Sequence, residues 1–595
     1  MREYSTPQTI EIPTTGSLTD DVVRNAAEAP AAVQFSRATA DGGWSDVTCA
    51  EFLAEVAALA KGLMAAGIEA GDRVAIISRT RYEWTLLDYA IWFAGAATVP
   101  IYESSSEEQI AWILSDSAAR AVVCEDAGHR AKVDAIRGAT ALEHVWTITD
   151  DAVATVTALG AVVSDADLEA RRTAVGPADL ATLIYTSGTT GRPKGCMLTH
   201  DNFQTELGVA VAELERLFDA EGASTLLFLP LAHVFARIIQ VGCVKSRTRL
   251  GHSADIKNLL PQLATFRPTF ILAVPRVFEK VFNTASQKAT ADGKGKIFDR
   301  AAEAAIAYSR ALDAGRVPLR VRAQHTLFSR LVYGKLRSAL GGNCAYAVSG
   351  GAPLGDRLGH FYRGVGVTVL EGYGLTETTA ALTVNLPDAQ KVGTVGRPIQ
   401  GTAVRIADDG ELLFRGGQVF TGYWNNPDAT AEALDADGWF HTGDVGEVDD
   451  EGFVRITGRK KEILVTAGGK NVAPAVLEDR VRAAALVSQC LVVGDGQPFI
   501  GALVTIDEEA FPAWAEQHGK TGKIADLVDD DDLRAEIQTA IDEANKAVSK
   551  AESIRKFTIL PADWTEEAGQ VTPSLKLKRN VVMRECRDEI AALYG

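Results

Sequence analysis

The chain has 595 residues, of which 47% are hydrophobic and 23% are charged. That length exceeds what one hydrophobic core supports, so we expect two or more domains. The formal net charge is −18, from 60 Lys and Arg against 78 Asp and Glu, which argues against nucleic acid as a partner because a phosphate backbone requires a basic surface.

The seven cysteines are scattered and include no C-x-x-C pair. This usage predicts neither a disulfide framework nor a zinc site and fits a cytoplasmic protein. The first residues lack the apolar core of a signal peptide, and the most apolar window, residues 88–102, is shorter than the roughly 20 residues that span a bilayer. The sequence leaves open the oligomeric state and a peripheral contact with the inner face of a membrane.

The N-terminal part of the chain alternates strands with helices. We expect helices at 82–93 and 106–116, the second with Ser106 and Gln109 as a capping box. This β–α–β order predicts a layered α/β fold with parallel strands. The expected strands are 74–78, 97–101, 121–124, 181–184, 226–229, 270–274, 345–348 and 367–370. Residues 280–340 are predicted to be helical. Ligand groups gather at the carboxyl ends of such strands, so the loops that follow them are the candidate site.

A loop rich in glycine and hydroxyl groups follows the strand at 181–184. It reads Tyr185-Thr186-Ser187-Gly188-Thr189-Thr190-Gly191-Arg192-Pro193-Lys194-Gly195. Its glycines let backbone N–H groups approach a ligand, and its hydroxyls and Lys194 can bind an oligophosphate. It is not the common P-loop, because no Gly-Lys-Ser/Thr closes it. A plain surface loop is the alternative.

This loop resembles the phosphate loop of the adenylate-forming superfamily, which contains acyl-CoA synthetases, firefly luciferase and the adenylation domains of peptide synthetases. Five further segments match in order, so the resemblance covers about residues 74–579. It implies a large N-terminal domain, 1–457, of layered α/β sheets plus a small β unit. A hinge at 458–461 and a small, mobile α+β C-terminal domain, 462–595, would follow. The implied phosphate-binding residues are Thr186, Ser187, Gly188, Thr189, Thr190, Gly191 and Lys194.

Three matching segments would bind the rest of ATP. The turn Ser349-Gly350-Gly351-Ala352 borders adenine in the superfamily, and a plain glycine-rich turn is the alternative. The resemblance implies that the segment Glu371-Gly372-Tyr373-Gly374-Leu375-Thr376-Glu377 supplies an adenine-stacking Tyr373, a phosphate-bonding Thr376 and a Mg²⁺ ligand, Glu377. The alternatives are that Tyr373 is a core residue and Glu377 a solvated one. Asp444 matches the ribose-binding carboxylate, with Arg459 as its partner from across the domain boundary. A turn residue is the alternative, since Asp444 follows a glycine.

The remaining matches concern the reacting groups and the domain movement. The resemblance places His233 beside the acyl carboxylate, whereas a structural histidine is the alternative. Lys461 matches the hinge, and Gly468 and Gly469 match a hairpin that admits the narrow arm of coenzyme A.

The C-terminal match supplies the catalytic lysine. Lys576, with Arg579 three residues on, fits the register of that motif. Leu575 stands where many relatives have glycine, so Lys578 remains a rival.

The nearest resemblance is to bacterial long-chain fatty-acid–CoA ligases, carried by residues 229–237, 274–278 and 574–579. It implies an enzyme that uses ATP, Mg²⁺, coenzyme A and a fatty acid. The alternatives are a fatty acyl-AMP ligase that serves a carrier protein, a luciferase-like oxygenase and a non-catalytic acyl-nucleotide sensor. A sensor needs no movable lysine, so Lys194, Glu377, Asp444 and Lys576 together argue against it. The sequence does not set the acyl chain length or the pathway.

Overall fold

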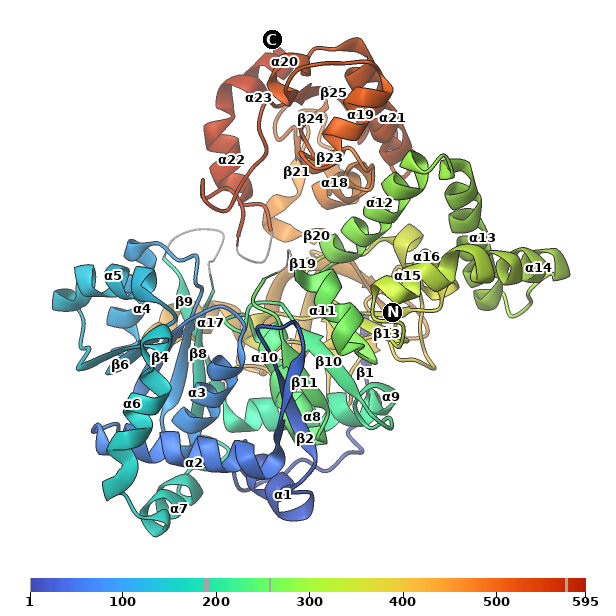
Figure 1. Ribbon diagram of the computed structural model, residues 1–595. Coiled ribbons are helices and arrows are strands. Elements are labelled where there is room, and N and C mark those ends of the chain that lie inside the picture. The colour runs from blue at the N-terminus through green and yellow to red at the C-terminus, as the bar shows by residue number, and fades with distance from the viewer. Residues whose placement is uncertain (1, 187–191, 256–257, 573–575) are drawn as a thin grey trace.

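The computed structural model describes residues 2–186, 192–255, 258–572 and 576–595. Three sheets form a large lobe, and two further sheets form a small domain above it (Figure 1). The α/β fold expected from the sequence is confirmed. Helices cover the sheets of the large lobe, and the C-terminus lies in the small domain.

A six-stranded sheet has the order β7-β6-β4-β5-β8-β9, and only β9 is antiparallel to its neighbour. Its strands are β4 (Arg73–Ile77), β5 (Ala97–Ile101), β6 (Ala121–Cys124), β7 (His144–Thr147), β8 (Leu180–Thr186) and β9 (Lys194–Thr199). Its helices include α2 (Cys49–Ala65), α3 (Tyr82–Phe93), α4 (Glu107–Asp116), α5 (Ala127–Ile136), α6 (Ala152–Leu159) and α7 (Asp165–Thr173). The bounds of α3, β5 and β6 are those expected from the sequence, and the capping box at Ser106 forms.

The second sheet has nine strands in the order β16-β15-β14-β13-β12-β10-β11-β2-β3. These are β2 (Val33–Ala38), β3 (Trp44–Thr48), β10 (Ser224–Leu227), β11 (Arg249–His252), β12 (Phe270–Ala273), β13 (Tyr346–Ser349), β14 (Thr368–Tyr373), β15 (Thr383–Val384) and β16 (Arg397–Pro398). Strand β14 extends three residues beyond the predicted end because Gly372 and Tyr373 pair with β15. Nearby helices are α1 (Asp20–Glu28), α8 (His200–Glu213), α9 (Glu215–Phe218), α10 (Val234–Ser246) and α11 (Leu259–Phe266).

The third sheet is antiparallel, with the order β1-β17-β18-β19-β20. Its strands are β1 (Glu3–Ser5), β17 (Ala403–Ile406), β18 (Glu411–Arg415), β19 (Phe440–Val448) and β20 (Val454–Arg459), and α17 (Pro427–Ala433) precedes β19. Residues 458 and 459 of the predicted hinge therefore belong to β20, and the chain leaves this sheet through the 3₁₀ turn η7 (Lys460–Glu462).

The small domain has its own hydrophobic core around Leu477, Val504 and Ile537. A hairpin, β21 (Leu464–Val465) and β22 (Asn471–Val472), precedes a sheet of β23 (Val487–Val493), β24 (Ile500–Ile506) and β25 (Ile554–Ile559). Its helices are α18 (Pro474–Arg482), α19 (Phe511–Gln517), α20 (Ile524–Leu527), α21 (Asp531–Asn545), α22 (Arg579–Glu585) and α23 (Arg587–Tyr594). Strand β25 was not anticipated from the sequence.

A group of helices projects sideways from the large lobe (Figure 1). It consists of α12 (Pro275–Ala291), α13 (Gly295–Asp313), α14 (Leu319–Phe328), the π-helical turn η5 (Ser329–Tyr333), α15 (Gly334–Ala339) and α16 (Asp356–Val365). The helices expected within 280–340 are confirmed. Tyr333 fixes η5 to α13 because its hydroxyl donates to the Ala301 carbonyl at 2.7 Å.

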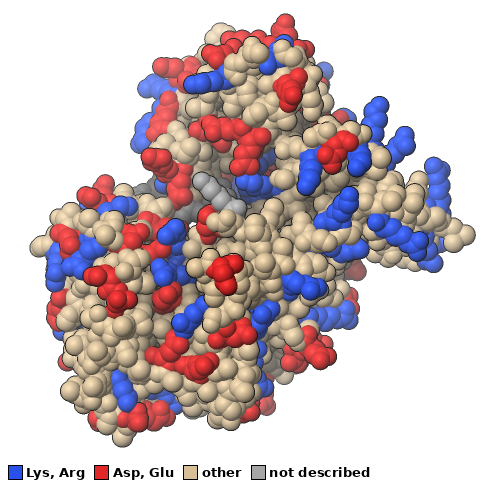
Figure 2. Space-filling model, viewed as in Figure 1, with Lys and Arg blue, Asp and Glu red and all other residues tan. Residues whose placement is uncertain are grey.

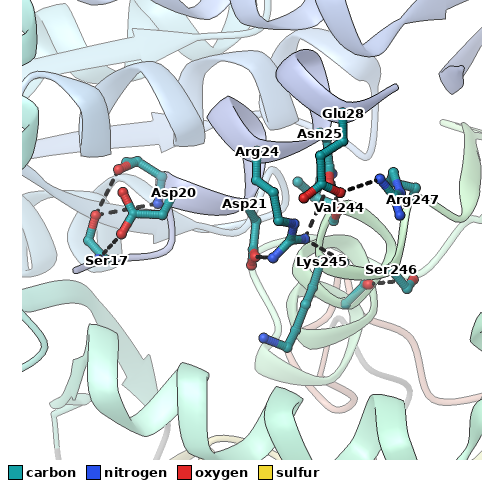
Figure 3. A network of polar contacts seen from close by, with 12 residues as sticks. Ser17, Asp20, Asp21, Arg24, Asn25, Glu28, Val244, Lys245, Ser246 and Arg247 are labelled. Atoms are coloured by element: carbon teal, nitrogen blue, oxygen red, sulfur yellow. Dashed lines mark hydrogen bonds and ion pairs between the residues drawn. The ribbon is translucent and has the colours of Figure 1, made fainter. Parts of the chain in front are cut away.

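Side chains of α1 hold the far end of helix α10 in place (Figure 3). The last carbonyls of a helix have no partner within it. Here Asn25 Nδ2 donates to the Val244 carbonyl at 2.5 Å, and Arg24 Nη2 donates to the Lys245 carbonyl at 2.7 Å. Arg247, just beyond the helix, pairs with Glu28 at 2.8 Å. These contacts fix the end of α10 opposite His233.

The middle of α10 is held by a buried ion pair between Arg237 and Asp88 of α3. Both side chains are 0% exposed. Thr98 and Gln240 also donate to the Asp88 carboxylate, at 2.6 and 3.1 Å. A buried charge needs such full hydrogen bonding to offset its lost hydration. The network therefore joins α10 to α3 and β5 and fixes the helix that begins at the candidate site.

All seven cysteines are buried and unpaired, so no disulfide joins any two of them. No helix within the described parts of the chain is long and apolar enough to cross a bilayer.

Candidate active site

The candidate catalytic lysine reaches the large lobe at the junction with the small domain, which Figure 2 shows as a hollow in the molecular surface. A Cβ atom built on Gly351 would lie 3.8 Å from Cε of Lys576. Two hydrogen bonds join Lys576 to Thr572. The Thr572 backbone N–H donates to the Lys576 carbonyl at 2.8 Å. The Lys576 N–H in turn donates to Oγ1 of Thr572 at 2.9 Å. The structure thus brings the predicted lysine to the predicted adenine turn.

The ammonium of Lys576 lies among charged groups of the large lobe. The Lys576 side chain is in contact with solvent at the cleft. Its pKa is nevertheless lowered, first by the loss of water from around the ammonium where the large lobe and the small domain meet, and then by the charge of Arg459. The carboxylates of Asp444 and Glu377 act in the opposite direction. Negative phosphates bound beside this lysine would oppose the lowering in the same way. Lys578 instead precedes α22 and donates its backbone N–H to the Gln570 carbonyl at 2.8 Å.

His233 caps the N-terminus of α10 at the same junction. Its Nδ1 accepts the Phe235 backbone N–H at 3.1 Å. Burial and then the charge of Lys576 lower the pKa of His233 to about 3, so the ring is neutral at physiological pH. Because Nδ1 is an acceptor, we assign the proton of the neutral ring to Nε2. His233 can therefore donate a hydrogen bond but cannot supply a positive charge.

The predicted phosphate loop connects β8 and β9. Ser187, Gly188, Thr189, Thr190 and Gly191 lie outside the described residues. Thr186 ends β8 and pairs across the antiparallel ladder with Lys194, the first residue of β9. The backbone pairing of these two residues brings the ends of the loop together, and the loop begins at the carboxyl end of β8, as the sequence predicts.

Tyr423 contacts two of the predicted site residues, Lys194 and Glu377, and was not itself predicted from the sequence. Nζ of Lys194 lies 4.7 Å from the centre of the Tyr423 ring. The Tyr423 hydroxyl donates to Oε1 of Glu377 at 2.8 Å. Tyr423 reaches this place because its segment pairs with β9, through a bridge with Cys196 and a hydrogen bond from the Trp424 N–H to the Gly195 carbonyl at 2.8 Å. An aromatic residue about 230 positions after Lys194 gives no local signal of this contact.

The predicted ribose-binding carboxylate is buried and already engaged on both oxygens. Asp444 lies on β19, with Oδ1 3.0 Å from Nε of Arg459 and Oδ2 accepting from the Tyr373 hydroxyl at 2.5 Å. Burial raises the pKa of Asp444, whereas Arg459 and then Tyr373 lower it. Arg459 was expected from across the domain boundary. It instead pairs directly with Asp444 across the β19–β20 ladder, which positions it without any movement of the small domain.

The adenine turn and the segment from Glu371 lie on neighbouring parallel strands. Ser349 pairs with Glu371 in the β13–β14 ladder. Gly350, Gly351 and Ala352 follow β13, and Gly351 has a φ of +82°, which strains any residue with a side chain. Gly374 is required by packing, since a Cβ there would lie 1.4 Å from the Ala380 carbonyl oxygen. Gly372 is also tight, with a Cβ position 3.0 Å from the Thr383 carbonyl oxygen.

Glu371 provides a pH-dependent contribution to stability. Its Oε2 accepts the Leu354 N–H at 3.0 Å, and burial raises its pKa from 4.5 to about 7. The folded state therefore binds this proton more tightly than the unfolded state. The resulting stabilisation is present below pH 4.5 and is lost as pH rises through about 7.

We expect Glu371→Gln to remove this pH dependence. Measured by calorimetry, the variant should gain about 1–3 kcal/mol relative to the wild type between pH 5 and pH 8, since one pKa unit corresponds to about 1.4 kcal/mol. The exposed Glu447, replaced by Gln, is the matched control. Parallel pH profiles for wild type and Glu371→Gln would contradict the assignment.

Thr376 and Glu377 lie in a 3₁₀ turn that follows β14, η6 (Thr376–Thr378). The backbone carbonyl of Glu377 accepts the Phe420 N–H at 2.7 Å, which fixes this turn against the segment that carries Tyr423. Within the described ranges, no group of three or more His, Cys, Asp or Glu side chains could hold a metal ion. A metal at Glu377 would thus depend on ligands from the substrate and solvent.

The predicted hinge and coenzyme A hairpin lie on the small-domain side of the cleft. Lys461 is exposed in η7, and the neighbouring Lys460 pairs with Glu411 at 2.9 Å. Gly468 and Gly469 are exposed in the turn between β21 and β22, where the Gly469 N–H donates to the Thr466 carbonyl at 2.8 Å. Gly469 has a φ of +76° and open space around its Cβ position.

Ion pairs hold the small domain against α12. Arg276 Nη2 lies 3.0 Å from Asp507, and Lys280 Nζ lies 2.9 Å from Glu509. Arg357 of α16 also donates to the Ala483 carbonyl at 3.2 Å. Lys576 faces the large lobe while these contacts are formed. Any rotation that withdraws Lys576 by moving the small domain away from α12 must break them.

Two protein families match the two parts of the chain. Residues 20–424 match the family described as AMP-binding enzyme, and residues 461–595 match the family described as AMP-binding enzyme C-terminal domain. The second match begins within η7, immediately after β20.

Relatives cover the whole chain. This chain is 53% identical to the long-chain-fatty-acid–CoA ligase FadD15 of Mycobacterium tuberculosis and to the protein of the same name from Mycobacterium bovis. Each match covers 100% of this chain and 100% of the relative. Among solved structures, the anthranilate CoA ligase AuaEII in complex with anthranoyl-AMP superimposes with a TM-score of 0.74 at 19% identity. That match covers 98% of this chain and 99% of the other and supports the fold alone.

Proposed function

Because this chain belongs to the AMP-binding enzyme family, we propose that it is an AMP-forming long-chain fatty-acid–CoA ligase. The 53% identity to FadD15 over both full lengths supports the substrate class. The observation that carries the chemistry is the position of Lys576 beside Gly351, within the influence of Asp444 and Glu377. One cation delivered to a nucleotide site by a separate domain suits an enzyme that adenylates an acid.

In the first step, a carboxylate oxygen of the fatty acid attacks the α-phosphorus of ATP. A new P–O bond forms, the bond from the α-phosphorus to the bridging oxygen breaks, and pyrophosphate leaves. Phosphoryl transfer of this kind depends mainly on positioning and on stabilisation of negative charge. Lys576 supplies the charge, Asp444 binds the ribose hydroxyls, and His233 donates from Nε2 toward the acyl carboxylate.

In the second step, the sulfur of coenzyme A attacks the acyl carbonyl, and AMP leaves with the electrons of the C–O bond. Lys576 is not required for this step, and the narrow arm of coenzyme A needs space beside the acyl group. We propose that the small domain rotates about Lys461, withdraws Lys576 and presents the Gly468–Gly469 turn. Exposed glycines with open space at the Cβ position of Gly469 support this role.

Glu377 suits a magnesium ion that arrives with ATP. Mg²⁺ is usually bound by one or two carboxylates together with substrate phosphates and waters rather than by a full protein cage. Glu377 is a single, half-buried carboxylate whose Oε1 is oriented by Tyr423 at 2.8 Å. Bound there, Mg²⁺ would neutralise charge on the departing pyrophosphate. Lys194, whose ammonium lies over the Tyr423 ring, would contact the phosphates directly.

Pyrophosphate release tests the proposed function. We expect release with a panel of fatty acids to be greatest for long chains and to continue through many turnovers only when coenzyme A is present. AMP and acyl-CoA should then form in equal amounts. Multiple turnovers without coenzyme A but with an acyl carrier protein would favour the acyl-AMP ligase. Absence of acid-dependent pyrophosphate release would reject both enzymes.

A further inference from the structure

Helix α14 presents an unusual surface at the tip of the helical projection. None of its ten residues is buried. Leu319 is 82% exposed, and Leu327 and Leu331 are each 55% exposed. Within the described part of the chain, five of the nine exposed large hydrophobic residues lie on α13, α14 and η5. Exposed apolar side chains concentrated in this way mark an interaction surface.

Basic residues surround these leucines. Residues 314–339 contain five arginines, one lysine and no Asp or Glu, although the whole chain has a net charge of −18. Five of the six are exposed, and within the described residues none of these five side chains forms an ion pair: Arg316, Arg320, Arg322, Arg330 and Lys335. Figure 2 shows Lys and Arg gathered on this projection. We call these five cations and Leu319, Leu327 and Leu331 the α14 surface.

The opposite face of α14 is attached firmly to the large lobe. The ring of His325 stacks on Tyr308 with centroids 3.8 Å apart. Nε2 of His325 lies 2.7 Å from the Gly364 carbonyl oxygen. Leu319, Ala323 and Leu327 recur every four residues and so share one side of the helix. The fold thus holds an apolar and basic helix face outward in a fixed orientation.

We propose that the α14 surface docks the protein on a bilayer that contains anionic lipid. Leucines inserted at the acyl boundary, with cations at the headgroups, are the composition of an interfacial helix. A second copy of the chain fits poorly on this surface, because identical faces would bring uncompensated cations together. The proposed function supplies the purpose, since a long-chain acid partitions into the bilayer, but the evidence for docking is independent of it.

Co-sedimentation with vesicles tests the docking directly. The full-length protein should bind vesicles of mixed phosphatidylcholine and phosphatidylglycerol, and bind less at high salt or to phosphatidylcholine alone. Arg316→Gln with Arg320→Gln and Arg322→Gln should weaken binding at least about 10-fold, because it removes three of the cations attracted to the anionic headgroups. Leu319→Ser with Leu327→Ser and Leu331→Ser should weaken it similarly, since it removes the inserted apolar area.

Two sets of variants control for surface composition. Leu159→Ser with Val162→Ser removes exposed apolar side chains elsewhere, and Lys550→Gln with Arg584→Gln and Arg587→Gln removes exposed charges from the small domain. Both sets should bind vesicles as the wild type does. Circular dichroism verifies that every variant is folded.

Several outcomes would overturn the proposal. The proposal is wrong if the wild type binds neither kind of vesicle, or if the α14 variants bind as tightly as the wild type. It is also wrong if light scattering shows a dimer that the same variants abolish. Ligation of palmitate supplied in solution on serum albumin should be equal in all variants. Lack of ligation by every protein, with vesicle binding as expected, would reject the proposed function while leaving the docking surface supported.

Discussion

Replacing Lys576 by Met should reduce acyl-AMP formation about 100- to 1000-fold, the range observed when one charge-stabilising donor is removed from an active site. The side chain is nearly isosteric and uncharged, so the change removes the ammonium that lies near Asp444, Glu377 and Arg459. Thioester formation from preformed acyl-AMP should stay within about twofold, because that step does not transfer a phosphoryl group. Pyrophosphate release measures the first step, and acyl-CoA formed from synthetic palmitoyl-AMP measures the second.

Lys578→Met is the matched control for this prediction. Lys578 lies two residues further on in the same motif, but it immediately precedes α22 and its backbone N–H bonds within the small domain. The control should retain adenylation. Loss of adenylation in Lys578→Met rather than in Lys576→Met would reverse the assignment, and equal loss of both steps in Lys576→Met would reject the division of labour.

Lys461→Pro should separate the two steps in the opposite sense. Proline fixes φ near −65° and removes the backbone N–H, so it restricts the rotation that a hinge residue must allow. The structure has Lys576 at the large lobe, which is the arrangement needed for the first step. Adenylation should therefore remain within about fivefold of the wild type, while thioester formation from acyl-AMP should fall at least about 100-fold if domain rotation gates that step.

Lys461→Ala controls for loss of the side chain, and it should leave both steps near the wild-type rates. The ion pairs of Arg276 with Asp507 and of Lys280 with Glu509 would persist in the proline variant, because the domain could not leave α12. A proline variant that makes thioester at the normal rate would reject rotation about this residue.

Local patterns predicted the early α/β elements well. Helix α3 and strands β5 and β6 were predicted to the residue, because their apolar runs end at polar or turn residues. The capping box at Ser106 is also a local signal, since both of its hydrogen bonds span three residues. The order of such elements was enough to predict parallel layers.

Features that depend on distant pairing could not be predicted in this way. The extension of β14 through Tyr373 requires β15, and β25 requires a parallel partner, β24, about 50 residues earlier. Tyr423 reaches Glu377 only because its segment pairs with β9. Arg459 was assigned to the correct neighbour but by the wrong route, since the β19–β20 register sets its position. Chemistry was readable from motifs, whereas the geometry between motifs needed the tertiary structure.

The burial of every cysteine has a consequence for the fate of the activated acid. An acyl-adenylate is a mixed anhydride, and thiolates are the side chains most prone to attack it at neutral pH. Burial raises the pKa of Cys196, two residues from Lys194, and keeps its sulfur protonated and enclosed. The remaining six thiols are enclosed as well. The enzyme therefore keeps its own sulfur atoms from being acylated, and the reactive anhydride is preserved for a thiol that arrives from solution.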